Sequence, residues 1–310
     1  MKKVFIDGSA GTTGLRIRER LSERADITLL TLSEDKRKDP LARSEMLNAA
    51  DAVFLCLPDD AAREAVAMLQ NPDTVVLDTS TAHRTESGWC YGFPELSAER
   101  EEALRTSKRI AVPGCHASGF IALVYPLIQA GILSKDALLS ATSLTGYSGG
   151  GKKMIAEYEA EERDALLSAP RQYALGQTHK HLKEMKAVTG LENAPLFLPI
   201  VADFYSGMEV TVPLFASSLA SGFGMKDIKE VYASTYNTPM LSYVEGGDEG
   251  GFLSAASLSG KDSMQVSVFG NEERMLLVAR YDNLGKGASG AAIECMNISM
   301  GSERYEGLVL

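Results

Sequence analysis

The sequence has little of what metal-binding, secreted and membrane proteins depend on. Its 310 residues include four cysteines, and no two of them show the close spacing of a zinc or redox motif. No apolar run is long enough to cross a membrane, and the first residues are too few for a signal peptide. We therefore expect a cytoplasmic protein with free cysteines and no resident metal.

Positive charge is also scarce. The chain carries 31 Lys and Arg against 41 Asp and Glu, which gives a formal net charge of -10. Nucleic acids and anionic membranes attract basic surfaces, so this balance argues against both as the main partner. We expect individual basic residues to bind phosphate or carboxylate groups of small molecules.

The first twenty residues form a strand, a glycine turn and a helix. Residues 3–7 are a buried strand, the turn has the spacing Gly-x-x-Gly-x-x-Gly, and residues 15–21 continue as a helix. This is the context of a dinucleotide site, because a helix N-terminus can hold a pyrophosphate. The alternative is a glycine turn with no cofactor. The candidate cofactor residues in this loop are Gly8, Ser9, Gly11, Thr12, Thr13 and Gly14.

A second strand over residues 27–32 leads to a mixed charge run. An acidic residue at this place commonly holds the ribose hydroxyls, whereas basic residues accept a 2′-phosphate. The chain offers both, and the run Lys36-Arg37-Lys38 in so acidic a protein favours NADP(H). We take Ser33, Lys36 and Arg37 as cofactor residues. The competing interpretation is a solvated loop.

Further strands at residues 51–57 and 74–77 alternate with helices. This order predicts a Rossmann-type, doubly wound parallel sheet in an α/β protein. Asp78, Ser80 and Arg84 follow a strand's carboxyl end, where such sheets bind ligands. A surface turn would explain the same residue types.

A lone cysteine follows the next apolar strand, after Pro113-Gly114, and precedes the apolar helical stretch 120–133. Cys115 would therefore lie at a helix N-terminus, where unpaired N–H groups and the helix dipole favour a thiolate. A buried structural cysteine is the alternative.

Beyond Cys115 the pattern changes from alternation to mixed strands with few helices. We expect strands at 138–145, 196–204 and 208–217, a helix over 154–167, and a hairpin formed by 264–269 and 275–281. These elements predict an α+β domain over residues 115–282. A last helix, ending near Met300, should return to the first domain, which then comprises residues 1–114 plus 283–310.

Two of the four histidines share one turn, Thr178-His179-Lys180-His181. We expect Thr178 to cap a helix that ends at Gly190. His181 and Glu184 would then share a face, and His179 would point elsewhere. A carboxylate beside an imidazole supports acid–base chemistry. A surface turn, or half of a metal site with Cys115, would use the same residues.

Several motifs occur together in one order: the glycine loop, Asp78-Thr79-Ser80 with Arg84, Tyr91-Gly92-Phe93-Pro94-Glu95, Pro113-Gly114-Cys115, His179-Lys180-His181, and Asn283-Leu284-x-Lys286-Gly287-Ala288. In this combination the chain resembles the short form of the N-acetyl-γ-glutamyl-phosphate reductases, which belong with the aspartate-semialdehyde dehydrogenases. The resemblance covers nearly the whole chain. It implies an NADP(H)-dependent acyl-phosphate reductase that acts through a cysteine thioester in arginine biosynthesis.

The resemblance also implies a role for individual residues. Cys115 matches the nucleophile, and His181 matches the acid–base residue, with Glu184 behind it. Asn283 and Lys286 match the nicotinamide end of the cofactor site. The residues expected near the substrate are Arg84, Ser148, Gly149 and His179. The family implies homodimers or homotetramers, with the acyl phosphate and inorganic phosphate as small-molecule partners.

The chain departs from the family pattern beside its key residues. His116 stands where the residue after the cysteine is usually tyrosine, and Lys180 stands where arginine is common. Three rival functions remain open at this stage. Two of them are acyl-phosphate reductases, aspartate-semialdehyde dehydrogenase and the reductase of the aminoadipyl analogue, which is one carbon longer. No feature of the sequence settles the length of the substrate side chain, because one methylene contributes little to discrimination between substrates. A non-catalytic dinucleotide-binding regulator is the third.

Overall fold

The computed structural model describes residues 1–310, which divide into two compact units. The first unit comprises residues 1–114 and 288–308, and the second comprises residues 115–287 and 309–310. The last long helix therefore belongs to the first unit. Each unit is described by itself below.

The first unit contains a six-stranded, fully parallel sheet in the order β2-β1-β3-β4-β6-β5. Its strands are β1 Lys2–Asp7, β2 Ile27–Leu30, β3 Ala52–Leu55, β4 Val75–Asp78, β5 Cys90–Tyr91 and β6 Arg109–Ala111. Its helices are α1 Thr12–Ser22, α2 Pro40–Ala49, α3 Asp59–Ala67, α4 Ala98–Thr106 and α9 Gly290–Ser299, with short 3₁₀ turns at Glu34–Lys36 and Pro94–Leu96. The predicted doubly wound sheet is confirmed.

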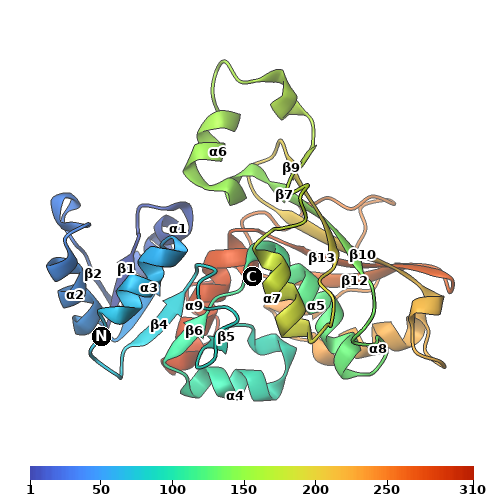
Figure 1. Ribbon diagram of the computed structural model, residues 1–310, viewed down its shortest axis with the longest axis horizontal. Helices are drawn as coiled ribbons and strands as arrows, with labels where there is room; N and C mark the ends of the chain where they lie inside the picture. The colour runs from blue at the N-terminus through green and yellow to red at the C-terminus, as the bar shows by residue number, and fades with distance from the viewer. The chain divides into compact units, whose positions relative to one another are not determined.

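Apolar residues on both faces of this sheet explain the layers. Every residue of β3 is buried, as in a parallel strand that is covered on both sides. Side chains of α1, α4 and α9 pack into one core cluster with β1, β3 and β4. Side chains of α2 and α3 pack into a second cluster on the other face. Figure 1 shows α9 lying along β4 and β6, although β4 ends at Asp78, β6 ends at Ala111 and α9 begins only at Gly290.

Two helices of this unit were not predicted from the sequence. Asp39 starts α2, because its carboxylate accepts hydrogen bonds from the N–H groups of Leu41 and Ala42, and Pro40 takes the first helical position. Ser97 caps α4 in the same way. Each helix buries one apolar side chain, Leu47 in α2 and Leu104 in α4, so its helical periodicity is weak.

The second unit contains a seven-stranded mixed sheet in the order β11-β12-β13-β10-β7-β9-β8. Its strands are β7 Ser140–Gly146, β8 Arg171–Gln172, β9 Leu196–Ala202, β10 Met208–Phe215, β11 Leu241–Tyr243, β12 Met264–Gly270 and β13 Arg274–Tyr281. Its helices are α5 Cys115–Gln129, α6 Gly151–Tyr158, α7 His181–Thr189 and α8 Met225–Thr235, with 3₁₀ turns at Tyr147–Gly150, Ala165–Ser168 and Ala216–Ser218. A π-helical turn, Gly285–Ser289, leads into α9.

Strand pairing in this sheet matches most of the prediction. The hairpin of β12 and β13 is antiparallel, as expected, and β13 also pairs antiparallel with β10. Two pairs, β7 with β9 and β11 with β12, are parallel. Alternate side chains of β10 are buried, and most side chains of β13 are buried; α5 packs on these two strands. The fold of this unit is thus the α+β arrangement predicted from its patterns.

The helix predicted over residues 154–167 is wrong in extent. Helix α6 ends at Tyr158, and a separate 3₁₀ turn begins after Asp164, whose carboxylate accepts a hydrogen bond from the Leu166 N–H. Leu167 and Tyr158 still pack in one small cluster, so the apolar pattern continued while the chain turned. Figure 1 shows α6 and the loop after it extending away from β7 and β9.

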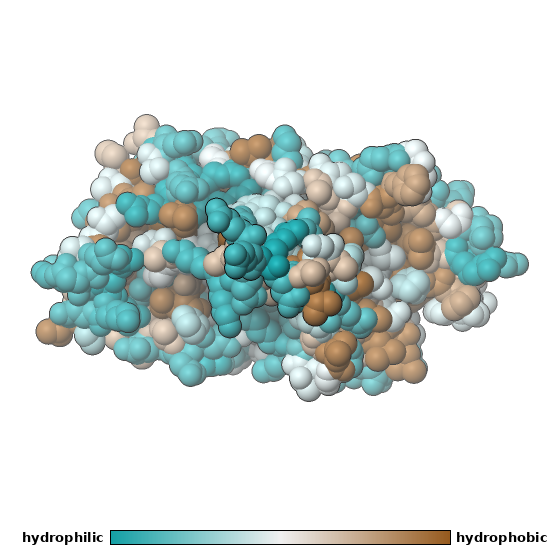
Figure 2. All heavy atoms as spheres, turned by 90° about the horizontal axis from the view of Figure 1, so that it is seen from above, coloured by the Kyte–Doolittle hydropathy of each residue, from teal (hydrophilic) through white to brown (hydrophobic).

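The surface mixes hydrophilic and hydrophobic side chains. Figure 2 shows this on one face, where hydrophobic residues lie among hydrophilic ones. No helix of the protein is both long enough and apolar enough to cross a membrane.

Candidate active site

Helix α5 begins at Cys115 itself, five residues earlier than its apolar run suggests. The thiol is partly exposed, and all four cysteines are free. This position gives the sulfur the N–H groups and the positive end of the helix dipole, which stabilise a thiolate. The expectation of a cysteine at a helix N-terminus is confirmed by this geometry.

His116 lies beside the cysteine and is almost fully buried, with 3% of its surface exposed. Its Nδ1 lies 2.7 Å from the Ser143 hydroxyl, and its Nε2 lies 2.6 Å from the Tyr173 hydroxyl. Burial, with a smaller effect of His179, lowers the pKa of His116 to about 3. A neutral imidazole has one donor and one acceptor, so one hydroxyl donates to the ring and the other accepts from it.

Tyr173 is influenced by the nucleophile as well. Its phenol pKa is raised, chiefly by burial and then by the negative charge that Cys115 can carry. This effect means that the phenol lies within electrostatic reach of the sulfur. Neither Tyr173 nor His116 was assigned a role from the sequence. Tyr173 is 58 residues from Cys115 in the chain, and the hydroxyl partners of the His116 ring are visible only in the folded protein.

His181 opens α7, which packs against α5. The predicted N-cap at Thr178 is wrong, because the helix starts at His181, with Lys180 as its N-cap. The Nδ1 of His179 accepts a hydrogen bond from the His181 N–H at 3.2 Å and thus performs the capping function. The predicted end at Gly190, which has a φ of 79°, is confirmed.

The prediction that His179 points away from His181 is also wrong. Their ring centroids are 4.7 Å apart, and each lies 5.6 Å from the ring of His116. Three of the four histidines therefore form one cluster at the start of α5. His181 and Glu184 are buried one turn apart on α7, with exposed fractions of 5% and 2%. Burial lowers the pKa of His179, and the charge of Lys180 adds to this effect.

A strained loop joins Tyr173 to His179. Ala174 and Gln177 have φ values of 52° and 53°, a conformation that L-residues rarely adopt. The Gln177 side chain holds the loop, because its amide donates to the Phe197 carbonyl and accepts from the Phe197 N–H, at 2.7 and 2.9 Å. The loop is thereby attached to β9, with a site residue at each end.

Strand β13 ends in a turn of polar residues in the same unit. Asn283 donates to the Ser148 hydroxyl at 3.0 Å and accepts from the Gly207 N–H at 2.9 Å. Ser148, Asn283 and Lys286 are all buried, with exposed fractions of 1%, 2% and 2%. Ser148 was predicted to lie near the substrate and Asn283 near the cofactor, and the two side chains contact each other directly. Gly149 adjoins them, since a Cβ there would lie 3.3 Å from the Asn283 amide nitrogen.

The glycine loop of the first unit follows β1 as predicted. Gly8 has a φ of +88°, and a Cβ at this position would lie 2.2 Å from the Cys56 carbonyl oxygen, so only glycine fits. Gly11 is the N-cap of α1, and the buried Thr12 hydroxyl oxygen at its first position has no hydrogen-bond partner in the protein. A helix N-terminus with an unsatisfied hydroxyl suits the pyrophosphate of a dinucleotide.

The basic residues after β2, which were predicted to bind the cofactor, differ in whether they already form an ion pair. Ser33 precedes the 3₁₀ turn Glu34–Lys36, and Arg37 forms an ion pair with Glu34. Lys36 is exposed and holds no ion pair. Lys36 is therefore more available than Arg37 to bind a 2′-phosphate, because Arg37 is already paired with Glu34.

Asp78 organises the turn after β4. Its carboxylate accepts from the Ser80 hydroxyl at 2.8 Å and lies 2.6 Å from Nδ1 of His83, which stacks on Trp89. Arg84 donates to the carbonyl oxygens of Val112 and Thr79. Asp78 is fully buried, so this is an internal turn and not a surface one. The Asp78 carboxylate thus contacts Ser80 and His83, whereas Arg84 bonds to backbone carbonyl oxygens. His83 was not predicted as a site residue from the sequence.

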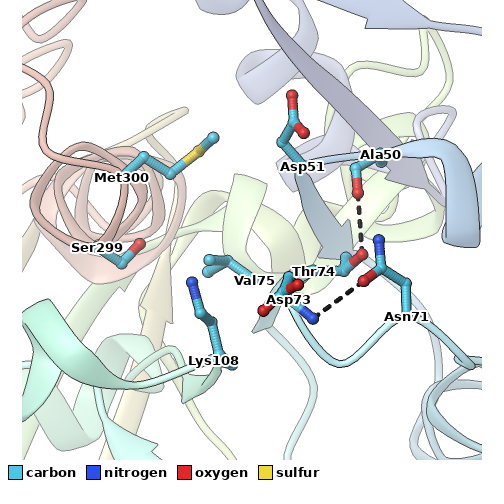
Figure 3. A pocket seen from close by; sticks show the side chains of 9 residues that line it. All are labelled: Ala50, Asp51, Asn71, Asp73, Thr74, Val75, Lys108, Ser299 and Met300. Carbon is cyan, nitrogen blue, oxygen red and sulfur yellow. Dashed lines mark hydrogen bonds between the residues drawn. The ribbon is translucent and has the colours of Figure 1, made fainter.

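A shallow cavity lies at the opposite edge of the first unit's sheet, near the starts of β3, β4 and β6 (Figure 3). Its polar groups already bond to one another: the Thr74 hydroxyl donates to the Ala50 carbonyl, and the Asp73 N–H donates to the Asn71 side chain. The cavity therefore has no evident part in the chemistry. No group of three or more His, Cys, Asp and Glu side chains in the protein could hold a metal ion.

Sequence comparison agrees with these two sites. Residues 3–104 match the NAD-binding domain of the semialdehyde dehydrogenases, and residues 115–283 match their dimerisation domain. N-acetyl-gamma-glutamyl-phosphate reductase 2 of a Nostoc species is 43% identical, with 99% of each chain covered. The Rhizobium meliloti N-acetyl-gamma-glutamyl-phosphate reductase is also 43% identical, over 96% of this chain and 98% of its own.

The chain belongs to the N-acetyl-γ-glutamyl-phosphate reductase family.

Solved structures agree with the fold of this family. Aspartate semialdehyde dehydrogenase II from Vibrio cholerae, complexed with ASA, superposes with a TM-score of 0.73 at 17% identity, covering 97% of this chain and 98% of its own. The Candida albicans enzyme, solved with NADP, gives 0.66 at 16% identity, with 96% and 98% covered. The expected family and fold class are therefore confirmed, and the chain is an enzyme with an NAD-binding domain.

Proposed function

We propose that this reductase converts N-acetyl-γ-glutamyl phosphate to N-acetylglutamate 5-semialdehyde with NADPH, as a step of arginine biosynthesis. The observation that carries the proposal is Cys115 at the N-terminus of α5, next to a cluster of three histidines. The 43% identity to named reductases over the full length supports the same substrate. Neither the aminoadipyl analogue nor a regulatory role has a specific observation in its favour.

Cys115 begins the reaction as a thiolate. Its sulfur attacks the acyl carbon, a C–S bond forms, and the C–O bond to phosphate breaks, with the electron pair leaving on inorganic phosphate. NADPH, when bound, supplies the hydride that reduces the thioester to a thiohemiacetal. The C–S bond then breaks, which releases the aldehyde and restores the thiolate.

His181 handles the proton in these steps. It protonates the oxygen that carries negative charge after reduction, and it takes that proton back as the aldehyde forms. Glu184, one turn away on α7, supports the charged imidazole. The His179 Nδ1 is occupied by the His181 N–H, so we assign His179 to substrate contact and to positioning of α7.

The remaining site residues bind and orient. Arg84, Ser148 and Gly149 are proposed substrate residues, and Asn283 and Lys286 are proposed to lie at the nicotinamide end of the cofactor. The residues proposed to hold the rest of NADP(H) are Gly8, Ser9, Gly11, Thr12, Thr13, Gly14, Ser33, Lys36, Arg37 and Ser80. In this assignment residues 1–114 plus 283–310 are the cofactor domain, and residues 115–282 are the catalytic domain.

We further propose a cytoplasmic homodimer or homotetramer. Free cysteines suit a reducing compartment. On the sheet of the second unit, the side chains that face away from α5 include Leu196 and Phe215, each 63% exposed, and Leu276 at 42%. An apolar sheet face of this kind is suited to a second copy of the chain.

The reverse reaction tests the function without the labile acyl phosphate. Protein is mixed with N-acetylglutamate semialdehyde, phosphate and NADP⁺, and NADPH is followed by its absorbance, with aspartate semialdehyde and NAD⁺ in parallel. We expect phosphate-dependent turnover with the acetylated aldehyde and loss of turnover in Cys115→Ser, which still binds NADPH. Turnover with aspartate semialdehyde alone would contradict the proposed substrate, and an active Cys115→Ser variant would contradict the proposed nucleophile.

A further inference from the structure

Three buried tyrosines donate hydrogen bonds to backbone carbonyl groups of α5. Tyr281 donates to Cys115, Tyr236 donates to Ala122 and Tyr232 donates to Leu123, each at 2.6 Å. None of the three phenols exposes more than 2% of its surface. The three contacts are chemically alike, but only Tyr281 reaches the first turn of the helix, where the nucleophile lies.

The Tyr281 hydroxyl also makes a second contact with this helix. It accepts a hydrogen bond from the Gly119 N–H at 3.0 Å while it donates to the Cys115 carbonyl. Cys115 and Gly119 are four residues apart, so they are the two groups that an intrahelical bond at the start of α5 would join. The hydroxyl therefore bridges the first turn of the helix and fixes the peptide plane that follows Cys115.

Gly119 leaves the space that this bridge needs. A Cβ at this position would lie 2.7 Å from the Tyr281 hydroxyl oxygen and 2.6 Å from a methyl carbon of Val210. Any larger residue would push the phenol out of the first turn. The contact therefore requires both a glycine at position 119 and a hydroxyl group at position 281.

The same strand end holds Cys115 from a second side. Directly after Tyr281, the Asp282 carbonyl accepts from the Gly285 and Gly287 N–H groups, and the Asp282 carboxylate accepts from the Leu284 N–H at 2.7 Å. This turn brings Gly287 against the cysteine, since a Cβ on Gly287 would lie 3.0 Å from the Cys115 Cβ. Strand β13 and its turn therefore contact both the carbonyl and the side chain of the nucleophile.

From this arrangement we infer that Tyr281 is a positioning residue, whose hydroxyl holds Cys115 in the orientation required for attack on the acyl carbon. The inference rests on the proposed role of Cys115 as nucleophile. A nucleophile displaced by about 1 Å can lose about 100-fold in rate while substrate binding is retained. The contribution of Tyr281 should therefore appear in kcat and in thiol reactivity, and not in KM.

The test compares Tyr281→Phe with Tyr236→Phe, a matched control that removes the same hydrogen bond from the same helix two turns further on. Two readouts are measured: kcat and KM in the phosphate-dependent reaction, and the rate of Cys115 alkylation by iodoacetamide from pH 5 to 9, followed on the Cys115 peptide by mass spectrometry. For Tyr281→Phe we expect kcat to fall about 10- to 100-fold and alkylation to slow about tenfold, with KM within about threefold. Tyr236→Phe should stay within about twofold on both readouts.

Equal values for the two variants would overturn the inference and leave Tyr281 a purely structural residue. If Tyr281→Phe does not fold, 3-fluorotyrosine at position 281 keeps the ring and changes only the donor strength of its hydroxyl. An unchanged alkylation rate in that protein would also overturn the inference. Failure of the proposed function is distinguishable, because the wild type would then show no phosphate-dependent turnover of the acetylated aldehyde, or Cys115→Ser would remain active, whatever the result at Tyr281.

Discussion

His116 and Tyr173 are 57 residues apart in the chain, and their Nε2 and hydroxyl oxygen lie 2.6 Å from each other beside Cys115. With Ser143 on the other ring nitrogen, the imidazole is enclosed between two hydroxyl groups. Since burial lowers the pKa of His116 to about 3, the ring is neutral near pH 7. It therefore orients hydroxyl groups and carries no charge of its own.

Neutral burial of His116 predicts a dependence of stability on pH. In the unfolded chain its pKa is about 6.5, so between pH 6.5 and about 3 the unfolded state binds a proton that the folded state does not. Stability from this group is complete above pH 6.5 and is lost as the pH falls. Between pH 7 and 4.5, we expect the wild type to lose about 2–3 kcal/mol more than His116→Gln, measured by urea unfolding. Equal losses in the two proteins would contradict this assignment.

The two histidines at the start of α7 should differ in their effect on rate. His181→Asn should lower kcat about 10²- to 10⁴-fold, the usual contribution of an acid–base group. His179→Asn should cost less than about tenfold, because the His179 Nδ1 already accepts the His181 N–H and cannot serve as a base without breaking that cap. Steady-state kinetics on both variants decide the matter. The reverse ranking would exchange their roles.

Lys36 should determine the preference for NADPH. Its ammonium group is exposed and holds no ion pair, so it is available to a 2′-phosphate. We expect Lys36→Glu to raise the KM for NADPH about tenfold, a loss of about 1.4 kcal/mol, and to leave the KM for NADH within about twofold. Lys38→Glu, with the same charge change two residues away, is the control. Equal effects of both variants would indicate a general charge effect and no specific contact.

The exposed apolar sheet face predicts where copies of the chain meet. Phe215→Asp introduces a charge at a residue that is 63% exposed on this face, and burying that charge in an interface would be costly. We expect sedimentation velocity to show a smaller species than the wild type. Phe252→Asp, at a loop residue that is 78% exposed and lies in no strand, is the control and should leave the assembly unchanged.

Local patterns were sufficient for much of the fold and for two parts of the site. The glycine loop and the position of Cys115 each depend on a few consecutive residues, so their geometry could be predicted without tertiary information. The alternation of strands and helices likewise predicted the parallel sheet. The start of α7 could not be read in this way, because its cap is a histidine ring and not one of the residues that usually cap helices.

The surroundings of Cys115 depend on contacts that are distant in sequence. Ser143, Tyr173 and Tyr281 come from three strands or loops, and no short motif connects them with the cysteine. His116 was visible in the sequence only as a departure from the family pattern. Its neighbours explain how the protein accommodates it: both ring nitrogens have a hydroxyl partner, so an imidazole can be buried there without an unsatisfied polar atom.

The return of α9 to the first unit has a consequence for how the protein is made. Ala291, Ile293 and Met296 of this helix belong to the same core cluster as Val4 and Phe54, and the Lys2 ammonium donates to the Met300 carbonyl. When only the first 114 residues have left the ribosome, the hydrophobic core of the first unit therefore still lacks the side chains of α9. The apolar surface of these residues stays exposed until the second unit and residues 288–308 have also been synthesised. Folding of the first unit therefore depends on residues at both ends of the chain.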